Sequence, residues 1–366
     1  MYRFSIAVLT LATLTACGGE TADSEAAALA ATPFTVAAGV EFADHADEGH
    51  LRNVRQLTFD GENAEAYFSN EGTQLVFQRT ETADGSCDRI WRMDLATGDT
   101  TAVSTGEGRT TCSYFYPGDD KIIYASTHHE SAFCPAPPDF SLGYVWAVYP
   151  SYDLWVSNPD GSDMQRLTDT PGYDAEATVS PTGDRVIFTS TRDGDLDLYS
   201  MNLDGSDVVR LTERQGYDGG AFFSPDGSKI VWRAHYPETD QDIADYERLL
   251  EAGLIRPSVL EIWTMNADGS NKTQVTNNGA ANFGPYWHPS GDKIIFSSNV
   301  ADPTGRDFDL FMINADGSGQ EQITHTADFD GFPMFSPDGR YLVWGSNRNT
   351  SHEGNTNMFI AEWVEN

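Results

Sequence analysis

The chain has 366 residues, and its 22 lysines and arginines stand against 56 aspartates and glutamates, which gives a formal net charge of −34. A surface with so few basic residues does not neutralise phosphates, so we exclude a nucleic-acid-binding protein, and the same charge would repel an anionic lipid surface. The chain is too rich in hydrophobic residues, at 39%, for a disordered protein, and its 33 glycines and 17 prolines favour many short strands joined by turns.

An apolar segment at residues 4–16, preceded by Arg3, is about half as long as a membrane-spanning helix and predicts a secretion signal. It ends in Leu-Thr-Ala-Cys at 14–17, which resembles the lipobox of bacterial lipoproteins. The resemblance implies cleavage before Cys17 and lipidation of its thiol, and the two glycines that follow imply the outer membrane. We therefore expect a signal peptide at 1–16, a lipidated flexible tether at 17–53, and a periplasmic protein that meets the membrane only through its lipid anchor.

From residue 54 the chain repeats one pattern six times, which predicts a repeat fold. Each unit contains a tight Ser-Pro-x-Gly turn between two apolar segments, because proline presets the first turn torsion and glycine accepts a positive φ. Copies of this turn occur at 180–183, 224–227, 288–291 and 336–339, with degenerate ones at 69–72 and 116–120. An Asp-Gly turn and a closing strand that ends in Leu-Thr, Val-Thr or Ile-Thr follow. One unit thus predicts four antiparallel strands, and six units predict an all-β, six-bladed β-propeller over residues 54–366.

These units resemble the PD40, or WD40-like, repeats of the TolB-type six-bladed propellers of bacterial envelopes, from about residue 54 to the end. The last unit stops after its third strand, and residues 54–58 carry the missing Leu-Thr ending. We therefore expect the N-terminal strand to complete the last blade and close the ring, which removes open sheet edges. Only a short tether precedes the propeller where TolB has an α/β domain, so the resemblance implies a TolB-like lipoprotein rather than TolB itself.

The spacing of the turns predicts insertions of about 20 residues in the second and fourth blades, each between strands 2 and 3. The first, at about 128–152, is rich in proline and aromatic residues. The second, at about 237–257, predicts a short helix that starts at Thr239 and Asp242 and stops at Gly253. Long loops on a rigid ring often bind partners, so we expect binding on this loop-rich face. The alternative is that the insertions only plug the ring and bury their aromatic rings against each other.

Alignment of the six units places one polar residue of each unit at the entry of the innermost strand, where it would ring the channel mouth. These residues are Asn63, Thr110, Asp174, Asp218, Asn282 and Asp330. Aromatic residues precede three of them, Glu65 and Glu176 follow two residues later, and basic residues lie on nearby loops. A polar mouth edged by aromatic rings suits a peptide or a glycan. The alternative is that the aspartates and asparagines only cap loop amides.

The resulting candidate binding residues are Tyr173, Asp174, Glu176, Arg192, Tyr217, Asp218, Arg233, His235, Asn282, Phe329, Asp330 and Arg348.

Three cysteines remain besides Cys17, all expected on the loop-rich face, and secretion favours disulfides. We predict a Cys87–Cys112 bond, with Cys112–Cys134 as the competing pair. One thiol is left over in either case.

Two possible metal sites are not favoured by the sequence. The three cysteines with His128 lack the short spacing that is typical of zinc sites. The alternating aspartates at 193–197 resemble a calcium loop but lack a distal glutamate at a fixed spacing. The sequence therefore predicts neither a metal nor a cofactor.

No Ser-His-Asp arrangement, phosphate-binding glycine loop or HExxH motif is recognisable in the sequence. We predict a non-enzymatic propeller that binds an envelope protein or peptide through its loop-rich face. The alternative is a glycan-binding or metal-dependent lyase-like propeller, since distant relatives with similar repeats, the oligogalacturonate lyases, use channel histidines around a divalent metal. His235 and His288 are expected on opposite faces, however, and an acidic mouth is a poor receptor for a polyanionic sugar.

Overall fold

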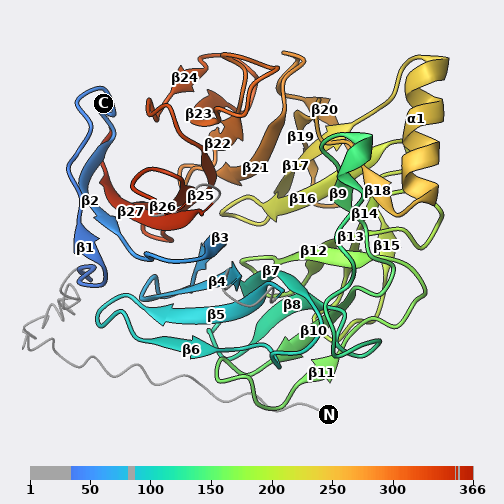
Figure 1. The fold of residues 1–366 in the computed structure, drawn as a ribbon, viewed down its shortest axis with the longest axis horizontal. Helices are drawn as coiled ribbons and strands as arrows, with labels where there is room; N and C mark the ends of the chain where they lie inside the picture. The colour runs from blue at the N-terminus through green and yellow to red at the C-terminus, as the bar shows by residue number, and fades with distance from the viewer. Residues whose placement is uncertain (1–33, 81–86, 351, 353–354, 366) are drawn as a thin grey trace, which may run out of the picture. The chain divides into compact units, whose positions relative to one another are not determined.

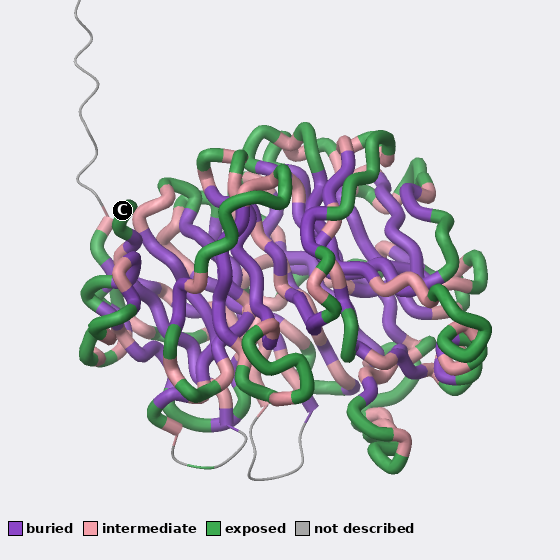
Figure 2. Tube along the Cα trace, turned by 90° about the horizontal axis from the view of Figure 1, so that it is seen from above, coloured by how far each residue is buried: buried purple, intermediate pink, exposed green. Residues whose placement is uncertain are grey.

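The computed structural model describes residues 34–80, 87–350, 352 and 355–365, and from Thr35 onward the chain forms a ring of six antiparallel sheets (Figure 1). The prediction of a six-bladed propeller is confirmed. In blades 1 to 5 the innermost strand comes first and each following strand of the blade pairs with the one before it, on its outer side. Blade 6 starts in the same way but takes its outer strands from the N-terminal segment. Seen edge-on, the buried residues follow the strands and the exposed ones follow the loops of the two faces (Figure 2).

The first three blades follow one another along the chain. Blade 1 consists of β3 (Glu62–Phe68), β4 (Gln74–Thr80), β5 (Arg89–Asp94) and β6 (Thr100–Ala102). Blade 2 consists of β7 (Thr110–Phe115), β8 (Ile122–Ser126), β10 (Asp153–Ser157) and β11 (Gln165–Arg166). Blade 3 consists of β12 (Asp174–Val179), β13 (Val186–Ser190), β14 (Asp197–Met201) and β15 (Val209–Arg210).

The other three blades complete the ring. Blade 4 consists of β16 (Tyr217–Phe223), β17 (Lys229–His235), β19 (Glu261–Asn266) and β20 (Thr273–Gln274). Blade 5 consists of β21 (Asn282–Trp287), β22 (Lys293–Ser298), β23 (Asp309–Asn314) and β24 (Glu321–Gln322). Blade 6 consists of β25 (Asp330–Phe335), β26 (Tyr341–Ser346), β27 (Asn357–Trp363), β2 (Leu51–Gln56) and β1 (Val40–Glu41).

The ring closes through the N-terminal strand, as the repeat pattern predicts. β2 pairs antiparallel with β27, the third strand of the last blade. Thr58 then repeats what the Leu-Thr threonine does elsewhere: its hydroxyl accepts a hydrogen bond from the Met358 amide at 2.9 Å, as the Thr168 hydroxyl does from the Leu154 amide at 2.9 Å. The threonine of the Leu-Thr motif therefore ties the fourth strand to the third through a hydrogen bond to its hydroxyl.

The propeller begins before the predicted boundary at residue 54, so the expectation of a tether up to residue 53 is wrong for its second half. β1 pairs with β2, the His50 ring stacks on Trp363 at 4.5 Å between centroids, and Glu48 is fully buried against Arg348. The predicted signal peptide and Cys17 lie outside the described residues. Of the helices in the described part of the chain, none is long and apolar enough to cross a membrane.

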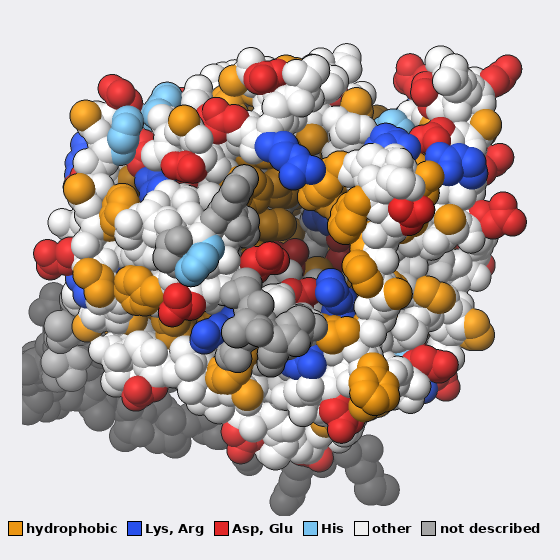
Figure 3. Space-filling view, viewed as in Figure 1, with side chains coloured by type: hydrophobic (Ala, Val, Ile, Leu, Met, Phe, Trp, Pro, Cys, Tyr) orange, Lys and Arg blue, Asp and Glu red, His pale blue; other side chains and the backbone are white. Residues whose placement is uncertain are grey.

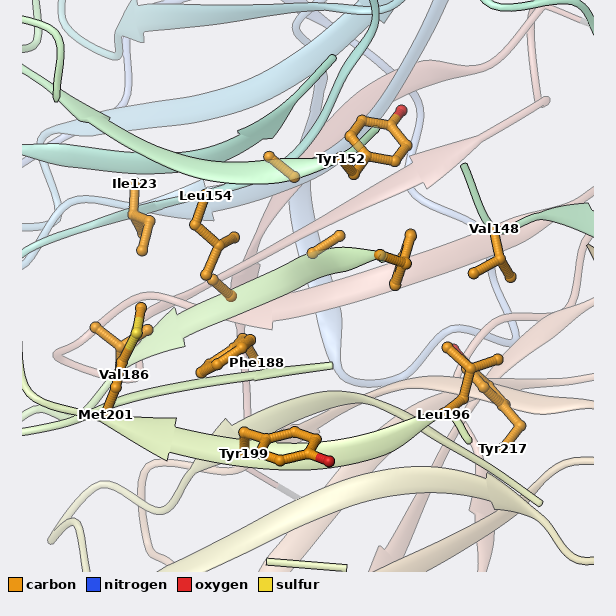
Figure 4. Close-up of a cluster of buried hydrophobic side chains, with 14 of the residues drawn as sticks. Ile123, Val148, Tyr152, Leu154, Val186, Phe188, Leu196, Tyr199, Met201 and Tyr217 are labelled. Carbon is orange, nitrogen blue, oxygen red and sulfur yellow. The ribbon is translucent and has the colours of Figure 1, made fainter. Parts of the chain in front are cut away.

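The core lies between neighbouring blades, where the apolar face of each strand packs on the next sheet. Figure 4 shows one such cluster, in which Ile123 and Leu154 of blade 2 lie over Val186 and Phe188 of blade 3. All four side chains have no exposed surface. Burial of each such side chain stabilises the fold by about 1.5–3 kcal/mol, which makes the ring a rigid support for its loops.

The predicted insertions are present on one face. The second contains α1 (Asp240–Glu251), whose first turn is capped because the Thr239 hydroxyl accepts a hydrogen bond from the Asp242 amide, and Gly253 with φ of 69° follows its end. The first contains the short 3-10 helix η1 (Phe140–Leu142). The helix and both of its predicted boundaries are confirmed.

Candidate functional site

Every innermost strand has a bulge at its middle, and the residue at the bulge has a left-handed backbone conformation. The register of all six first-to-second strand pairs shifts at this place. The six residues, with φ between 49° and 58°, are Glu65, Cys112, Glu176, Gly220, Gly284 and Phe332. A bulge re-aims a side chain, so these positions line the axis of the ring at one level. Four of them are not glycine, and each of those holds backbone strain of about 1–3 kcal/mol, which is characteristic of functional positions.

Aromatic rings close the channel directly below this level. The rings of Tyr67 of blade 1 and Phe222 of blade 4 are 5.5 Å apart, although their blades lie on opposite sides of the axis. Tyr114 and Tyr286 complete the layer, at 5.6 Å from Tyr67 and 5.3 Å from Phe222, respectively. The upper part of the channel is therefore a cup, with these four rings as its floor and the six bulge residues as its wall. We call this site the cup.

One side of the cup holds a buried ion pair. Arg233 on β17 donates to the Glu176 carboxylate, which also accepts hydrogen bonds from the Thr189 hydroxyl at 2.8 Å and the Tyr217 hydroxyl at 3.2 Å. Burial lowers the pKa of Arg233, but Glu176, Tyr217, Glu65 and Cys112 together outweigh it, so the net pKa is raised and the guanidinium stays charged. Gly220 leaves room for this pair, since a Cβ there would collide with the guanidinium.

Glu65 lies beside this pair without a cation of its own. Among the described residues its Oε2 has no hydrogen-bond partner, although that oxygen is buried. Burial raises the pKa of Glu65 to about 7, and the neighbouring Cys112 thiol and Arg233 only partly offset that effect. Burial likewise holds the pKa of the Cys112 thiol well above its usual value. The cup therefore contains one carboxyl group that is poised to titrate near neutral pH.

The opposite side of the cup is aromatic. Phe332 packs against Phe283 at 5.2 Å and Phe329 at 6.2 Å between ring centroids, and Phe283 and Phe329 stack at 6.1 Å. Trp146, from the first insertion, extends this wall: its ring lies 6.4 Å from Phe283, and the Arg233 guanidinium lies 5.3 Å from its centroid. The rim of the cup is thus completed by an insertion.

The two insertions hold each other in place across blade 3. Residues Trp146–Ala147 (β9) pair antiparallel with Leu254–Ile255 (β18), and Val145, Leu249 and Leu254 form a small buried cluster. Beneath them, the Tyr246 hydroxyl donates to Asp195, which anchors α1 on the blade. The insertions do bury part of their apolar surface against each other. Three aromatic side chains nevertheless stay exposed on the first insertion: Phe133 at 83%, Phe140 at 60% and Tyr144 at 54%.

Figure 3 shows this face hollowed at its centre, where acidic, basic and hydrophobic side chains meet. The hollow has the features of a ligand site: apolar walls and a few converging polar groups.

The predicted polar ring does not line the mouth. All six residues are at most 1% exposed, and their hydrogen bonds stay within their own blade or reach the neighbouring one, as that of the Thr110 hydroxyl to the Asp88 carbonyl does. Asp218, for example, accepts hydrogen bonds from the Trp232 indole and the Tyr236 hydroxyl, each at 2.6 Å, and Asn282 accepts one from the Ser298 hydroxyl at 2.7 Å. The expectation of a mouth ring is wrong for these positions. The capping alternative does not describe them either, because in the described structure their partners are side chains and carbonyl oxygens, such as Arg192 for Asp174 and the Asp88 carbonyl for Thr110, rather than loop amides.

Two predicted basic residues are structural for the same reason. Arg192 is paired with Asp174 at 3.0 Å, and Arg348 is buried between Asp330 and Glu48. Neither guanidinium is left for a ligand.

The other predicted residues divide between the cup and its surroundings. Glu176, Tyr217 and Arg233 meet in the cup, and Phe329 belongs to its aromatic wall. Tyr173 is buried under the first insertion against Tyr152 at 5.8 Å. His235 ends β17, where burial lowers its pKa, and it makes no contact with Glu176 or Glu65 in the described structure.

The predicted disulfide is also corrected. The structure joins Cys87 to Cys134, with 5.7 Å between their Cα atoms, and leaves Cys112 as a free thiol, so both the predicted pair and its competitor are wrong. Cys112 could not be tied to a loop because the bulge turns it into the channel. The disulfide instead ties the first insertion to blade 1.

Neither of the two possible metal sites is assembled in the described structure. Within the described residues, no three His, Cys, Asp or Glu side chains are grouped to hold a metal ion. The aspartates at 193–197 are used separately, by Tyr199, Tyr246 and Arg210.

Sequence reasoning missed three members of the cup: Glu65 as a candidate site residue, Cys112 and Phe332. The pattern that would have revealed them is the equivalent position two residues after the polar one, which is Glu, Cys, Glu, Gly, Gly and Phe in blades 1 to 6. A position that is a glutamate in some repeats and a glycine in others is not part of the hydrophobic core.

Comparison with known proteins agrees with this architecture. Residues 133–251 match the family model described as PD40, TolB beta propeller domain. No curated protein matches the chain. Among solved structures, a TolB-type protein of Agrobacterium tumefaciens is similar with a TM-score of 0.54 and 19% identity, over 84% of this chain and 91% of that one.

Two further structures share the fold. TolB of Acinetobacter baumannii has a TM-score of 0.53 and 17% identity, over 82% of this chain and 64% of that one, so the match spans less than two thirds of its length. Oligogalacturonate lyase of Vibrio parahaemolyticus has a TM-score of 0.51 and 13% identity, over 88% and 96% of the two chains. At these identities the similarity establishes a TolB-like propeller fold and leaves activity to the site itself.

Proposed function

We propose that this TolB-like propeller is a non-enzymatic, lipid-anchored protein of the periplasm that binds a protein or peptide partner of the cell envelope through its loop-rich face. The anchor would be Cys17 and the membrane the outer one, as the lipobox at 14–17 implies. The TolB-like fold supports this reading because such propellers present long loops on a rigid ring.

The observation that carries the proposal is the joined pair of insertions. Two loops that are far apart in sequence pair through β9 and β18 and hold aromatic side chains at the rim of a closed cup. Tyr144, whose hydroxyl accepts a hydrogen bond from the Trp146 indole at 3.1 Å, remains 54% exposed there, and Phe140 is 60% exposed on the same insertion. Rigid, exposed aromatic rings beside a concave site are the usual anchors of a protein interface, because they bury much area at a small loss of conformational freedom.

A glycan remains the second candidate ligand, since aromatic faces and hydrogen-bonding groups also suit sugars. The likeness to oligogalacturonate lyase is one of fold. His235 ends β17 on the loop-rich face, whereas His288 follows β21 on the other face and is paired with Glu365. These two histidines therefore cannot share a metal, and no group of three His, Cys, Asp or Glu side chains is assembled for one among the described residues, so we derive no lyase step. Loss of polyuronate cleavage on chelation would reverse this assignment.

In-cell photo-crosslinking tests the proposal. A photoreactive phenylalanine at Tyr144, on the rim, is expected to capture one envelope protein, whereas the same group at Glu71, exposed on the opposite face, is not. Tyr144 is the better position than Tyr217, whose ring is only 3% exposed. Equal capture from both positions, or capture from neither in cells that export the folded protein, would contradict binding through the loop-rich face.

A further inference from the structure

We propose that the cup binds a cationic group of its ligand, a guanidinium, amidinium or ammonium, through the carboxylate of Glu65. The inference rests on the proposed function, because it names the chemistry that the loop-rich face would recognise at its centre.

Of the acidic side chains near the bulges, Glu65 is the one that has no cationic partner in the described part of the chain. Glu176 is neutralised by Arg233, which lies between blades 3 and 4. Asp88, near the mouth, is paired with Arg109 at 3.2 Å. Glu65 Oε2 is buried, and in the described part of the chain no group donates to it. The Cys112 thiol is hydrogen-bonded to the same carboxyl group, but it does not serve this second oxygen. A buried carboxylate oxygen without a partner is costly, so a ligand cation that supplies the missing donor would recover this cost.

The backbone holds Glu65 in this place at the expense of strain. Its φ of 53° is left-handed, whereas the equivalent positions of blades 4 and 5 are the glycines that this conformation favours. A glycine at residue 65 would remove both the strain and the unpaired carboxylate. That the chain carries Glu65 instead is best explained by a use for the carboxylate in the cup.

The walls already accommodate one guanidinium. Arg233 lies 5.3 Å from the ring of Trp146 and 5.6 Å from the ring of Tyr217, which is the range of cation–π contacts. Across the cup, Phe332 and its neighbours offer a further aromatic surface. A flat cation between aromatic rings, with its end on a carboxylate, fits this arrangement. An anionic ligand would find the charge of Arg233 already neutralised by Glu176, with only its Nε left without a partner among the described residues, and would be repelled by Glu65.

Binding should depend on pH because only the ionised carboxylate attracts a cation. Burial raises the pKa of Glu65 to about 7. The ionisable groups that face it are Cys112, Glu176, Arg233, Asp88 and Tyr67. Since Arg233 keeps its charge and the pKa values of the Cys112 thiol and the Tyr67 phenol are raised well above their usual values, Glu65 is the group that changes charge between pH 6 and pH 8. The affinity for a cation should therefore rise about tenfold over this interval.

The test uses benzamidine, a flat aromatic cation, and benzamide, its neutral counterpart of the same shape, titrated into the purified full chain. We expect benzamidine to bind at least tenfold more tightly than benzamide at pH 8, and Glu65→Gln to weaken benzamidine about ten- to hundredfold and to abolish its pH dependence. Glu71→Gln, on the opposite face, should leave the affinity unchanged. Equal binding of the two probes, binding of neither, or an unchanged affinity in Glu65→Gln would overturn the proposal.

This result is separable from the proposed function. Capture of an envelope protein from Tyr144 without benzamidine binding would refute the cation site and leave the binding face standing. Benzamidine binding without capture would do the reverse.

Discussion

The ring is closed in part by a buried ionic group of Arg348, Glu48 and Asp330, which the repeat pattern does not predict. Arg348 donates to both oxygens of Glu48, at 3.0 and 3.1 Å, and to Asp330 at 2.8 Å. Glu48 and Asp330 have no exposed surface, and Arg348 is 4% exposed. Since Glu48 precedes β2 and Asp330 begins β25, this group ties the N-terminal segment to the innermost strand of blade 6. We predict that Arg348→Met destabilises the whole ring.

The expected loss is about 3–5 kcal/mol in the free energy of unfolding, because the substitution leaves two buried carboxylates facing each other without a cation. Glu48→Gln should cost less, about 1–3 kcal/mol, since the Arg348–Asp330 pair survives. Burial raises the pKa of Asp330, and Arg348 opposes that rise. Without Arg348 the folded-state pKa lies further above the unfolded value, so the variant should be more stable at pH 5 than at pH 8, as the protonated form carries no uncompensated charge.

Urea denaturation at pH 8 and pH 5 measures both effects. The matched control is Arg248→Met, which breaks an exposed pair with Asp245 on α1 and should change the free energy of unfolding by less than about 0.5 kcal/mol. A loss below about 1 kcal/mol for Arg348→Met at pH 8, or a variant that gains nothing at pH 5, would refute the reasoning.

Three further predictions concern the disulfide, a buried acid and the bulge. Peptide mapping without reduction should find Cys87 linked to Cys134 and Cys112 free, and a linked Cys112 would contradict the structure. Cys87→Ser should lower the free energy of unfolding by up to about 4 kcal/mol, because the bond closes a loop with a sequence separation of 47. Burial raises the pKa of Asp218 to about 7, above its unfolded value. Asp218 therefore contributes stability at low pH, and this contribution is lost as the pH rises from about 4 through 7, by at most about 1.4 kcal/mol per pH unit. Thermal melts of Asp218→Asn should show a smaller loss between pH 5 and pH 8 than the parent, and an identical slope would exclude this group as the cause. Gly220→Ala should lower the free energy of unfolding in urea by at least about 1–3 kcal/mol, because the φ of Gly220 is 58° and the new Cβ would meet the Arg233 guanidinium. An unchanged free energy of unfolding would show that the bulge is not held rigidly.

The repeat pattern predicted the architecture because the turns and the closing Leu-Thr motifs recur with fixed chemistry. Proline and glycine mark the turns, and threonine marks the closing strand, so even the role of Thr58 in closing the ring followed from its place after Leu57. The helix of the second insertion was predictable for the same reason, since Thr239 and Gly253 act locally. The early start of the propeller was not predictable in this way, because Glu48 and His50 are fixed by partners hundreds of residues away.

The direction of the side chains in the innermost strands was not predictable from alternation. Residues two apart in a regular strand share a face, which is why Asp174 and Glu176 were both expected at the mouth. The bulge changes the direction between them: Asp174 bonds to Arg192 inside its blade, whereas Glu176 enters the cup. The disulfide failed for the same reason, since Cys112 is turned inward by its bulge while Cys87 and Cys134 meet on the loops.

The cup exists because the six repeats differ at one position. Six large side chains at this level would fill the axis, and six carboxylates would repel one another in a buried site. Gly220 leaves space into which Arg233 reaches, and Gly284 leaves space beside Phe332. The Arg233 guanidinium is paired with Glu176, so among the described residues Glu65 has no ion-pair partner of its own. Glu65 on blade 1 lies next to the aromatic wall of blades 5 and 6, and the Glu176–Arg233 pair lies across the axis from that wall. A ligand would therefore present its cation toward blade 1 and its apolar surface toward blades 5 and 6.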